Sequence, residues 1–568
     1  MNFTLNHPYQ FATEYTEPVA YFCMEYAIHQ PLKTYAGGLG YLAGSHMRSA
    51  FDLRQNIVGI GILWKYGYYD QVRKSDQTME VLFQEKMYGF LEPTGIKFTI
   101  RISSTDVWVT AYYLPCSVFN TAPLFLLSTD LPENDYLART ISHKLYDPNP
   151  ETQIASSILL GIGGCKLLEY LHWKPVVYHM NESHALPVAF YLFNKLKNVE
   201  EVKKRLVFTN HTAEEGGNPK TSIWLLEKMG FFYDLPTEQI KSLGLYSGDL
   251  LNHTYAALKL SRIANAVSKL HHKKLMNIWK DHKDLCQIIS ITNAQNFNYW
   301  SDNKMYECLR VNNFEKFRKL KTLAKELLFE VVADQNGEIL DKNILTIVFA
   351  KRFTGYKRPD LLFLDMQRFD KLMQNKDRPI QIIWAGKPYP ADYAAIGIFD
   401  KIVNVCKNYN NCSVVAGYEL KLSKLLKNGA DIWLNVPRMG HEASGTSGMS
   451  AAMNGAINLS IADGWVPEFA RDKVNCFVAP HADITLTDHQ LDEIDAVNLY
   501  DLLENEVIPM YYEHPEKWFS MIKSSMEDVL PYFDSSRMVS EYYSELLLHP
   551  KSVKIFSLTA RPSIHKQY

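Results

Sequence analysis

Short apolar runs alternate with longer amphipathic stretches along the whole chain. In the first half, these runs are rich in β-branched and aromatic residues, and we interpret them as strands at 19–24, 57–63, 176–180 and 206–209. A second series follows at 344–349, 380–384, 413–415, 432–435 and 457–461. Strands that alternate with helices predict parallel sheets covered by helices on both faces.

The length of 568 residues is too great for a single hydrophobic core. We therefore predict an α/β fold with two doubly wound, Rossmann-like domains that face a central cleft. The predicted domains are residues 1–295, residues 296–514, and a group of C-terminal helices in 515–568 that packs back on the first domain. Nearly every predicted strand runs into Gly, His, Asn, Lys or Arg, which suit ligand binding at the carboxyl ends of parallel strands.

Composition narrows the classes of partner. Lys and Arg number 60 and Asp and Glu 62, so the net charge gives no reason to expect nucleic acid or a membrane as a partner. The first residues show no targeting pattern, no run of about 18 apolar residues occurs, and the eight cysteines are scattered, so we expect a cytoplasmic protein with reduced thiols. No metal-ligand spacing such as H-E-x-x-H occurs, and we expect no metal.

A glycine-rich segment, YAGGLG, follows the first predicted strand. Gly37, Gly38 and Gly40 could present backbone N–H groups to an anion at the start of a helix. A simple tight turn explains the same glycines about as well.

A basic segment directly follows the apolar run at 344–349. Lys351, Arg352 and Lys357 are thereby held at the end of a buried strand, which suits a phosphate site. A solvated basic turn is the alternative interpretation.

A segment of small residues, EASGTSGM, precedes an apolar stretch that has the pattern of a helix. Glu442, Ser444, Gly445 and Thr446 could line a sugar pocket with one carboxylate, hydroxyl groups and backbone N–H groups. A capped helix start would have the same composition.

Polar residues also follow two predicted strands of the first half. Asn181 and His184 come after the run at 176–180, and His211 comes after the run at 206–209. Each histidine, taken alone, is better explained by a structural hydrogen bond than by catalysis.

Taken together, these segments resemble the short bacterial form of the α-glucan (glycogen, maltodextrin) phosphorylases. The order and spacing of the matching segments cover most of the chain. They read YFCMEYAIH, YAGGLGYLAGSHMRSA, VGIGILWKYGYYDQ, NESHA, VFTNHT, NAVSKLH, FAKRFTGYKRP, AGKPYPAD, GADIWLNVPR and EASGTSGMSAAMNGAINLSIADGW. The resemblance implies the GT-B glycosyltransferase architecture and a retaining transfer of a hexosyl unit.

The resemblance also implies roles for individual residues. The basic cluster would hold the phosphates of substrate and cofactor, with Gly37 and Gly38 on the opposite wall. The 442–445 loop would bind sugar hydroxyls and Thr446 a phosphate. His211 matches a histidine against the transferred glucose, and Tyr418 a tyrosine near the cofactor phosphate.

The position of the family's cofactor lysine is occupied by Ser450. A serine hydroxyl cannot form the imine that attaches pyridoxal phosphate, so we expect no covalent pyridoxal phosphate at this position. Non-covalent pyridoxal phosphate and a nucleotide sugar both stay open. The segments at 211–221 and 292–296 also depart from the family pattern, which indicates remodelled donor and acceptor pockets.

Three classes of function follow. The first is a phosphorylase-type hexosyltransferase, the second a glycosyltransferase that uses a nucleotide-diphosphate sugar without pyridoxal phosphate, and the third a catalytically silent glucan-binding or regulatory relative. The expected partners are a sugar phosphate, a nucleotide sugar or an α-glucan. A homo-oligomer stays open.

Overall fold

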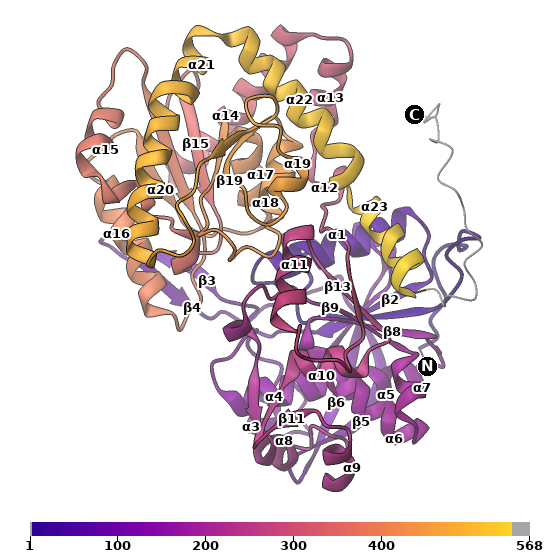
Figure 1. The fold of residues 1–568 in the computed structure, drawn as a ribbon. Helices are drawn as coiled ribbons and strands as arrows, with labels where there is room; N and C mark the ends of the chain where they lie inside the picture. The colour runs from indigo at the N-terminus through magenta and orange to yellow at the C-terminus, as the bar shows by residue number, and fades with distance from the viewer. Residues whose placement is uncertain (1–2, 548–568) are drawn as a thin grey trace.

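The computed structural model of the chain describes residues 3–547. Two parallel sheets with helices on both faces organise this part of the molecule (Figure 1). Residues 1–2 of the first predicted domain and residues 548–568 of the third lie outside the described residues. The domain boundaries themselves stay a prediction.

The first sheet has nine strands in the order β14-β13-β9-β8-β1-β2-β7-β6-β5. Its first seven strands in that order pair in parallel, whereas β6 and β5 are antiparallel additions at one edge. The strands are β1 (Val19–Phe22), β2 (Ile57–Ile62), β5 (Glu92–Ile102), β6 (Thr105–Leu114), β7 (Leu124–Ser128), β8 (Val177–Asn181), β9 (Leu206–Thr209), β13 (Ile263–Ala266) and β14 (Gln287–Ser290).

The second sheet has six strands, all parallel, in the order β17-β16-β15-β18-β19-β20. They are β15 (Leu345–Ala350), β16 (Ile380–Ala385), β17 (Cys412–Val415), β18 (Ile432–Asn435), β19 (Ile457–Ile461) and β20 (Phe477–Ala479). The predicted fold class, α/β with two doubly wound parallel sheets, is confirmed. The antiparallel edge of the first sheet was not predicted.

Helices connect the strands of both sheets. Those around the first sheet are α1 (Gly38–Asp52), α2 (Cys116–Phe119), α3 (Tyr136–Thr140), α4 (Pro150–Ile158), α5 (Gly164–Tyr170), α6 (Pro187–Leu196), α7 (Val199–Lys203), α8 (Ile223–Met229), α9 (Thr237–Ser242), α10 (His253–Leu260) and α11 (Lys269–Ile278). The later ones are α12 (Phe297–Trp300), α13 (Asn303–Arg310), α14 (Phe314–Asn336), α15 (Met366–Met373), α16 (Tyr393–Cys406), α17 (Leu420–Gly429), α18 (Ser447–Ala452), α19 (Val466–Phe469), α20 (Asp488–Leu502), α21 (Ile508–Glu513), α22 (Pro515–Phe533) and α23 (Ser535–Glu541).

Burial explains why the central strands are apolar throughout. Every residue of β1, β2, β9, β15 and β16 is buried, because helices cover both faces of a doubly wound sheet. In β5, by contrast, buried residues alternate with exposed or half-buried ones over much of the strand, which is typical of an edge strand with one solvated face.

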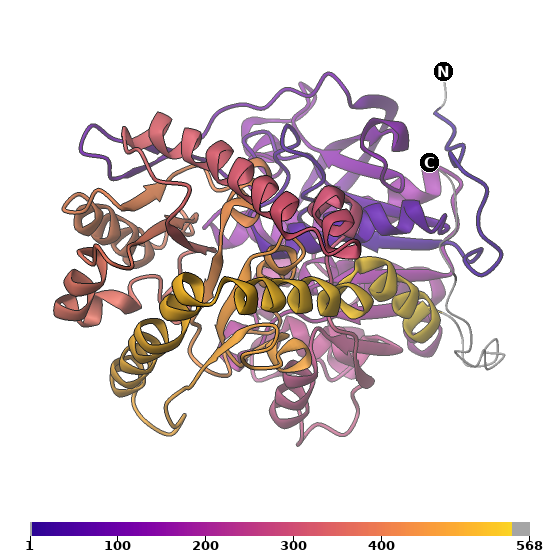
Figure 2. The same cartoon turned by 90° about the horizontal axis from the view of Figure 1, so that it is seen from above.

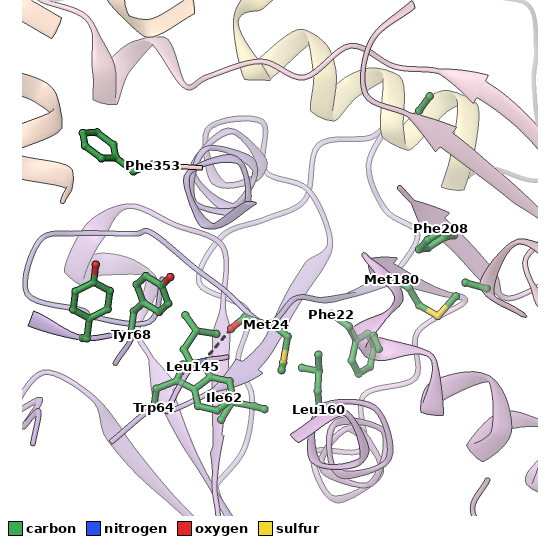
Figure 3. Close-up of a cluster of buried hydrophobic side chains, with 14 of the residues drawn as sticks. Phe22, Met24, Ile62, Trp64, Tyr68, Leu145, Leu160, Met180, Phe208 and Phe353 are labelled. Atoms are coloured by element: carbon green, nitrogen blue, oxygen red, sulfur yellow. Dashed lines mark hydrogen bonds between the residues drawn. The ribbon is translucent and has the colours of Figure 1, made fainter. Parts of the chain in front are cut away.

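A buried apolar cluster fixes the end of β1 near the meeting place of the two sheets. Figure 3 shows it running from Phe208 through Phe22 and Met24 to Tyr68 and Phe353. The indole Nε1 of Trp64 donates a hydrogen bond to the Met24 carbonyl oxygen at 3.0 Å. The chain leaving β1 is therefore held in one position.

Two segments join the parts of the molecule built on each sheet. The hairpin of β3 (Asp70–Arg73) and β4 (Met79–Leu82) reaches the second sheet, where Gln71 Nε2 donates to the Gly386 carbonyl at 2.9 Å. Helices α22 and α23 run back from the second sheet to the first (Figure 2). There the Ser535 and Ser49 hydroxyls lie 2.6 Å apart, which ties α23 to α1.

No helix within residues 3–547 is both long enough and apolar enough to cross a membrane.

Candidate functional site

A cavity of about 710 Å³ lies where the two sheets meet. Segments that leave the carboxyl ends of strands in both sheets line it, as expected for doubly wound folds. Its volume is in the range of pockets that hold a small ligand. The predicted site residues that line it are Gly37, Gly38, His184, His211, Lys351, Arg352, Lys357, Tyr418, Glu442, Ser444, Gly445 and Thr446.

Lys351 and Arg352 leave β15 at the floor of this cavity. The Lys351 side chain is buried, and its Nζ donates to the Ser447 hydroxyl at 3.2 Å. Burial lowers the pKa of Lys351 to about 7, and the nearby charge of Lys357 adds to this effect while Glu442 opposes it. A buried amine with a neutral partner lacks the counter-charge that an anionic ligand would supply.

Lys357 forms an ion pair with Glu442. Burial alone would lower the pKa of Lys357, but the Glu442 carboxylate and the Tyr356 hydroxyl hold it above its ordinary value. Burial alone would raise the pKa of Glu442, but Lys357, Lys351 and Arg352 hold it below its ordinary value. Both groups are therefore charged at neutral pH, and the cluster keeps an excess of positive charge.

The loop that carries Glu442 is fixed by the segment after β19. The Asp463 carboxylate accepts hydrogen bonds from the Gly440 and Glu442 N–H groups, both at 2.9 Å. The Trp465 N–H donates to the Ser444 carbonyl at 3.0 Å. The backbone of the loop is thus held by the segment after β19 before any ligand arrives.

Two residues of this loop have features that suit a ligand. Gly445 has a φ of +83°, which other residues rarely adopt. The Ser444 hydroxyl is buried and has no hydrogen-bond partner. Because buried hydroxyls are normally paired, this one is available to a sugar hydroxyl in the cavity.

The glycine segment forms the opposite wall. Helix α1 begins at Gly38, and a Cβ added at Gly37 or Gly38 would meet open space. The N–H groups of Ala36 and Gly37 donate to the Glu25 carboxylate at 2.7 and 3.0 Å. The Gly37 N–H is therefore engaged, contrary to the prediction, and an anion would meet the N–H groups that α1 leaves unpaired at its first turn.

Gly40 does not line the cavity. A Cβ at this position would lie 2.6 Å from the Tyr35 Cβ and 2.9 Å from a Glu25 carboxylate oxygen. A glycine is therefore required at position 40, because Tyr35 and Glu25 leave no room for a side chain.

His211 lies on the cavity wall after β9. Its Nε2 lies 2.7 Å from the Asn181 Oδ1, and its backbone N–H donates to Glu182 at 2.5 Å. Burial, with a contribution from His271, lowers the pKa of His211 to about 3, so the ring is neutral. Asn181 lies behind the wall and contacts the ring instead of the cavity.

His184 also lines the cavity as a neutral side chain. Burial lowers the pKa of His184 to about 4. Its Nδ1 is buried without a hydrogen-bond partner.

Tyr418 lines the cavity, whereas Ser450 does not. The Tyr418 hydroxyl donates to the Ala350 carbonyl at 3.2 Å, and burial raises its pKa to about 12. Ser450 is buried in α18. Its hydroxyl donates within its own helix, to the Thr446 and Ser447 carbonyls at 3.4 and 3.2 Å.

Several lining residues were missed by the sequence analysis. Glu25 and Lys387 follow strands β1 and β16, so the rule about strand ends could have found them. Lys387 donates to Glu419 at 2.8 Å and to the Tyr69 carbonyl at 2.9 Å. Tyr68, Asp147 and Tyr389 lie in connecting segments, where no pattern marks them.

Within residues 3–547, no group of three or more His, Cys, Asp and Glu side chains is placed to hold a metal ion.

Two family models match this chain. Residues 284–478 match the family model described as carbohydrate phosphorylase, and residues 62–289 match the model described as starch synthase catalytic domain. A protein of Methanocaldococcus jannaschii that is named only as uncharacterized is 45% identical over 93% of this chain and 99% of its own length.

Two relatives have functional names. The maltodextrin phosphorylase of Thermococcus litoralis is 34% identical over 95% of this chain and 71% of its own length. The glycogen phosphorylase of Aquifex aeolicus is 32% identical over 96% of this chain and 88% of its own length.

Proposed function

The chain belongs to the carbohydrate phosphorylase family, and on that premise we propose that it is a retaining hexosyltransferase. It transfers a glucosyl-type unit between a phosphate-bearing donor and an acceptor. The observation that carries the proposal is the cation cluster at the cavity floor, which faces the fixed 442–446 loop and the first turn of α1.

The donor phosphate would lie among Lys351, Arg352 and Lys357. Negative charge grows on the phosphate oxygen as its bond to the sugar breaks, and cations fixed in a buried site stabilise that charge strongly. The Lys357–Glu442 ion pair holds the ammonium group in place before the donor binds. The first turn of α1 would face the same phosphate from the other wall.

The sugar would lie against the 442–446 loop. The unpaired Ser444 hydroxyl and the Glu442 carboxylate can hydrogen-bond sugar hydroxyls, and Gly445 lies beside them. Thr446 would contact the phosphate. The neutral His211 ring would contact the sugar from the first-sheet side, with its orientation fixed by Asn181. Retention follows if the acceptor attacks the face that the leaving phosphate has just left.

Members of this family normally use pyridoxal phosphate, which supplies a second phosphate beside that of the substrate. The cation cluster fits such a phosphate, because Lys351 is buried with only a neutral partner. Ser450 does not fit as a covalent attachment point, because its hydroxyl bonds within α18 and it carries no amine.

The poor fit of Ser450 favours a second candidate. A nucleotide-diphosphate sugar would bring its own second phosphate to the same cations, so no cofactor would be needed. A catalytically silent glucan-binding or regulatory relative is the third candidate. Two buried groups argue against this third candidate, the unpaired Ser444 hydroxyl and the Lys351 amine. Neither group is needed for folding.

Replacing Lys357 tests the proposed leaving-group site. We expect Lys357→Ala to lower kcat/KM for sugar transfer by about 100- to 1,000-fold, because it removes charge stabilisation from the leaving phosphate. Transfer would be measured from α-glucose 1-phosphate and from UDP-glucose to maltooligosaccharides. Thermal unfolding of the variant would show whether it folds.

Lys401→Ala is the matched control, because Lys401 is an exposed lysine of helix α16, paired with Asp360. Its activity should equal that of the unmodified chain. Unchanged transfer by a folded Lys357→Ala variant would reject the assignment of the cluster.

The two donor classes can be separated by ligand protection. A donor that binds the native state at 100 times its Kd raises the free energy of unfolding by about 2.7 kcal/mol. Stabilisation by α-glucose 1-phosphate with phosphate would support the phosphorylase-type reaction, and stabilisation by UDP- or ADP-glucose alone would support the second candidate. Glucan binding without transfer from any donor would support the third.

A further inference from the structure

Helix α14 carries an apolar stripe on its solvated face. Leu323 and Leu327 are 53% and 47% exposed, and Leu320 beside them is half-buried. Residues three and four positions apart share one face of a helix, so the three side chains lie in one row. The opposite face of α14 is buried, and the helix packs on α17 and β17. Figure 2 shows α14 on the side of the molecule that faces the viewer.

Charged residues continue this row toward both ends of the helix. Lys316 and Lys319 precede the leucines on the same face. Glu330 and Asp334 follow the leucines there, and all four charged residues are exposed. Among residues 3–547, none of the four has an ion-pair partner, whereas Arg318 of the same helix does. We call the following seven residues the α14 stripe: Lys316, Lys319, Leu320, Leu323, Leu327, Glu330 and Asp334.

The order of these charges does not stabilise α14 itself. The start of a helix carries a partial positive charge and its end a partial negative charge, so a lysine is unfavourable in the first turn and an aspartate in the last. Lys316 lies in the first turn of α14 and Asp334 in the last. Glu315, also in the first turn, is already paired with Arg318. The stripe therefore suits a partner whose charges run in the opposite order.

A second copy of α14 has this opposite order when it lies antiparallel to the first. In a two-fold pair centred at position 325, residues equally far before and after the centre face each other. Leu323 would face Leu327 of the second copy, and Lys319 would lie beside Glu330 of the second copy. Each lysine of the stripe would thus meet an acidic residue, and the leucines would meet one another. The stripe is self-complementary in both apolar contact and charge.

We propose that the α14 stripe is a docking surface for a second copy of this chain, with the two helices antiparallel about a two-fold axis. The leucines form the apolar centre, and the charge pairs beside them set the orientation of the two helices. A single helix pair is a small contact, so the association is weak and depends on protein concentration and on salt. The inference goes beyond the proposed function, because association is measured without any sugar.

The first test is analytical ultracentrifugation of the full chain over a range of about 1 to 100 μM. We expect the dimer fraction to rise over this range, and to fall in about 1 M sodium chloride, which screens the charge pairs. A chain that stays monomeric at about 100 μM in low salt would overturn the inference. The stripe would then be left to solvent or to a different protein.

Leu323→Lys tests the apolar centre. We expect the dimer Kd to rise by at least about tenfold, because the new ammonium group would be placed against Leu327 of the second copy. Thermal unfolding at about 1 μM, where the chain is monomeric, should be unchanged, because Leu323 is already half solvated. Leu137→Lys is the control, because Leu137 is an exposed leucine of α3. A dimer that Leu323→Lys leaves intact would contradict the assignment of the interface.

Charge reversal tests the antiparallel arrangement. Lys319→Glu and Glu330→Lys should each weaken the dimer, because like charges would meet at two symmetric places. The double variant should regain the affinity of the unmodified chain, since opposite charges face each other again. An equimolar mixture of the two single variants, one of them carrying a fluorescent label, should form a one-to-one dimer in the ultracentrifuge. If neither the double variant nor the mixture recovers association, the inference is wrong.

Discussion

Lys351 shows how a single buried side chain can set the response of the site to pH. Its pKa of about 7 arises mainly from burial, with Lys357 adding and Glu442 opposing. The ammonium form is therefore present below pH 7 and lost above it. Since the charged form attracts an anion and the neutral form does not, anion affinity must fall as the pH rises through 7.

Sulfate tests this dependence, because its charge does not change between pH 6 and pH 8. We expect sulfate affinity to fall by about fivefold to tenfold over that interval, measured by calorimetry. Lys351→Arg should flatten the profile, because a guanidinium group stays charged. A flat profile for the unmodified chain would contradict the role of Lys351.

Single residues also mark the limit of sequence reasoning. Lys351 and Arg352 could be placed at a ligand edge because an apolar strand precedes them. The burial of Lys427 could not be predicted, because Lys421, Lys424 and Lys427 follow one another at intervals of three on one helix, and nothing in the sequence distinguishes them. Only tertiary packing puts Lys427 against Trp300, whereas Lys421 stays exposed.

At the scale of elements, the loop that carries Glu442, taken here as residues 440–446, has a fixed conformation without a ligand. Asp463 holds its N–H groups, and Gly445 supplies the left-handed residue that the turn requires. A Cβ at Gly445 would also lie 3.2 Å from the Glu442 Cγ. Backbone conformation and the position of the Glu442 carboxylate are therefore coupled.

Gly445→Ala tests this coupling. We expect the free energy of unfolding to fall by about 1–2 kcal/mol, because an alanine is strained at this φ. Sugar transfer should fall as well, because Glu442 and Lys357 move together. Urea unfolding measures the first effect and donor kinetics the second.

Gly397→Ala is the control for this substitution. Gly397 lies inside α16, and a Cβ there would meet open space, so alanine should raise stability by about 0.5–1 kcal/mol. Equal effects of the two substitutions would show that the φ of Gly445 does not matter.

The strands show which elements the pattern of apolar and polar residues can predict. The runs at 344–349 and 432–435 match β15 (Leu345–Ala350) and β18 (Ile432–Asn435) closely, because a buried parallel strand is apolar along its whole length. β5 and β6 were missed, because an edge pair with one solvated face carries polar residues at alternate positions. β7 (Leu124–Ser128) was missed although all of its residues are buried, so an apolar run was not in every case recognised as a strand.

At the scale of the whole molecule, Glu419 links the part built on the first sheet to the part built on the second sheet. Its carboxylate pairs with Lys33 from the first part and accepts hydrogen bonds from Lys387 at 2.8 Å and Gln30 at 2.7 Å. Burial alone would raise the pKa of Glu419, but Lys387 and Lys33 lower it to about 2. The contribution to stability is therefore present above the unfolded pKa, about 4.3, and is lost as the pH falls toward 2.

Glu419→Gln should lower the free energy of unfolding by about 3 kcal/mol at pH 7, because it leaves Lys387 buried without its counter-charge. Urea unfolding should give the same difference at pH 7 and pH 6 and a smaller one at pH 4. Glu238→Gln, in an exposed pair with Lys241, is the control and should cost less than about 0.5 kcal/mol. If the difference in unfolding free energy were as large at pH 4 as at pH 7, the role of the carboxylate charge would be contradicted.

The chain passes between the two sheets' parts at neighbouring points. Gln295 and Asp534 form a parallel bridge there, with the Gln295 N–H donating to the Phe533 carbonyl and the Ser535 N–H to the Gln295 carbonyl, both at 3.0 Å. This pairing holds the two crossings of the chain side by side, and the hairpin of β3 and β4 ties the same two parts at a second place. A backbone cut in one of the two crossings would therefore leave the other crossing, and the hairpin, to keep the two parts together.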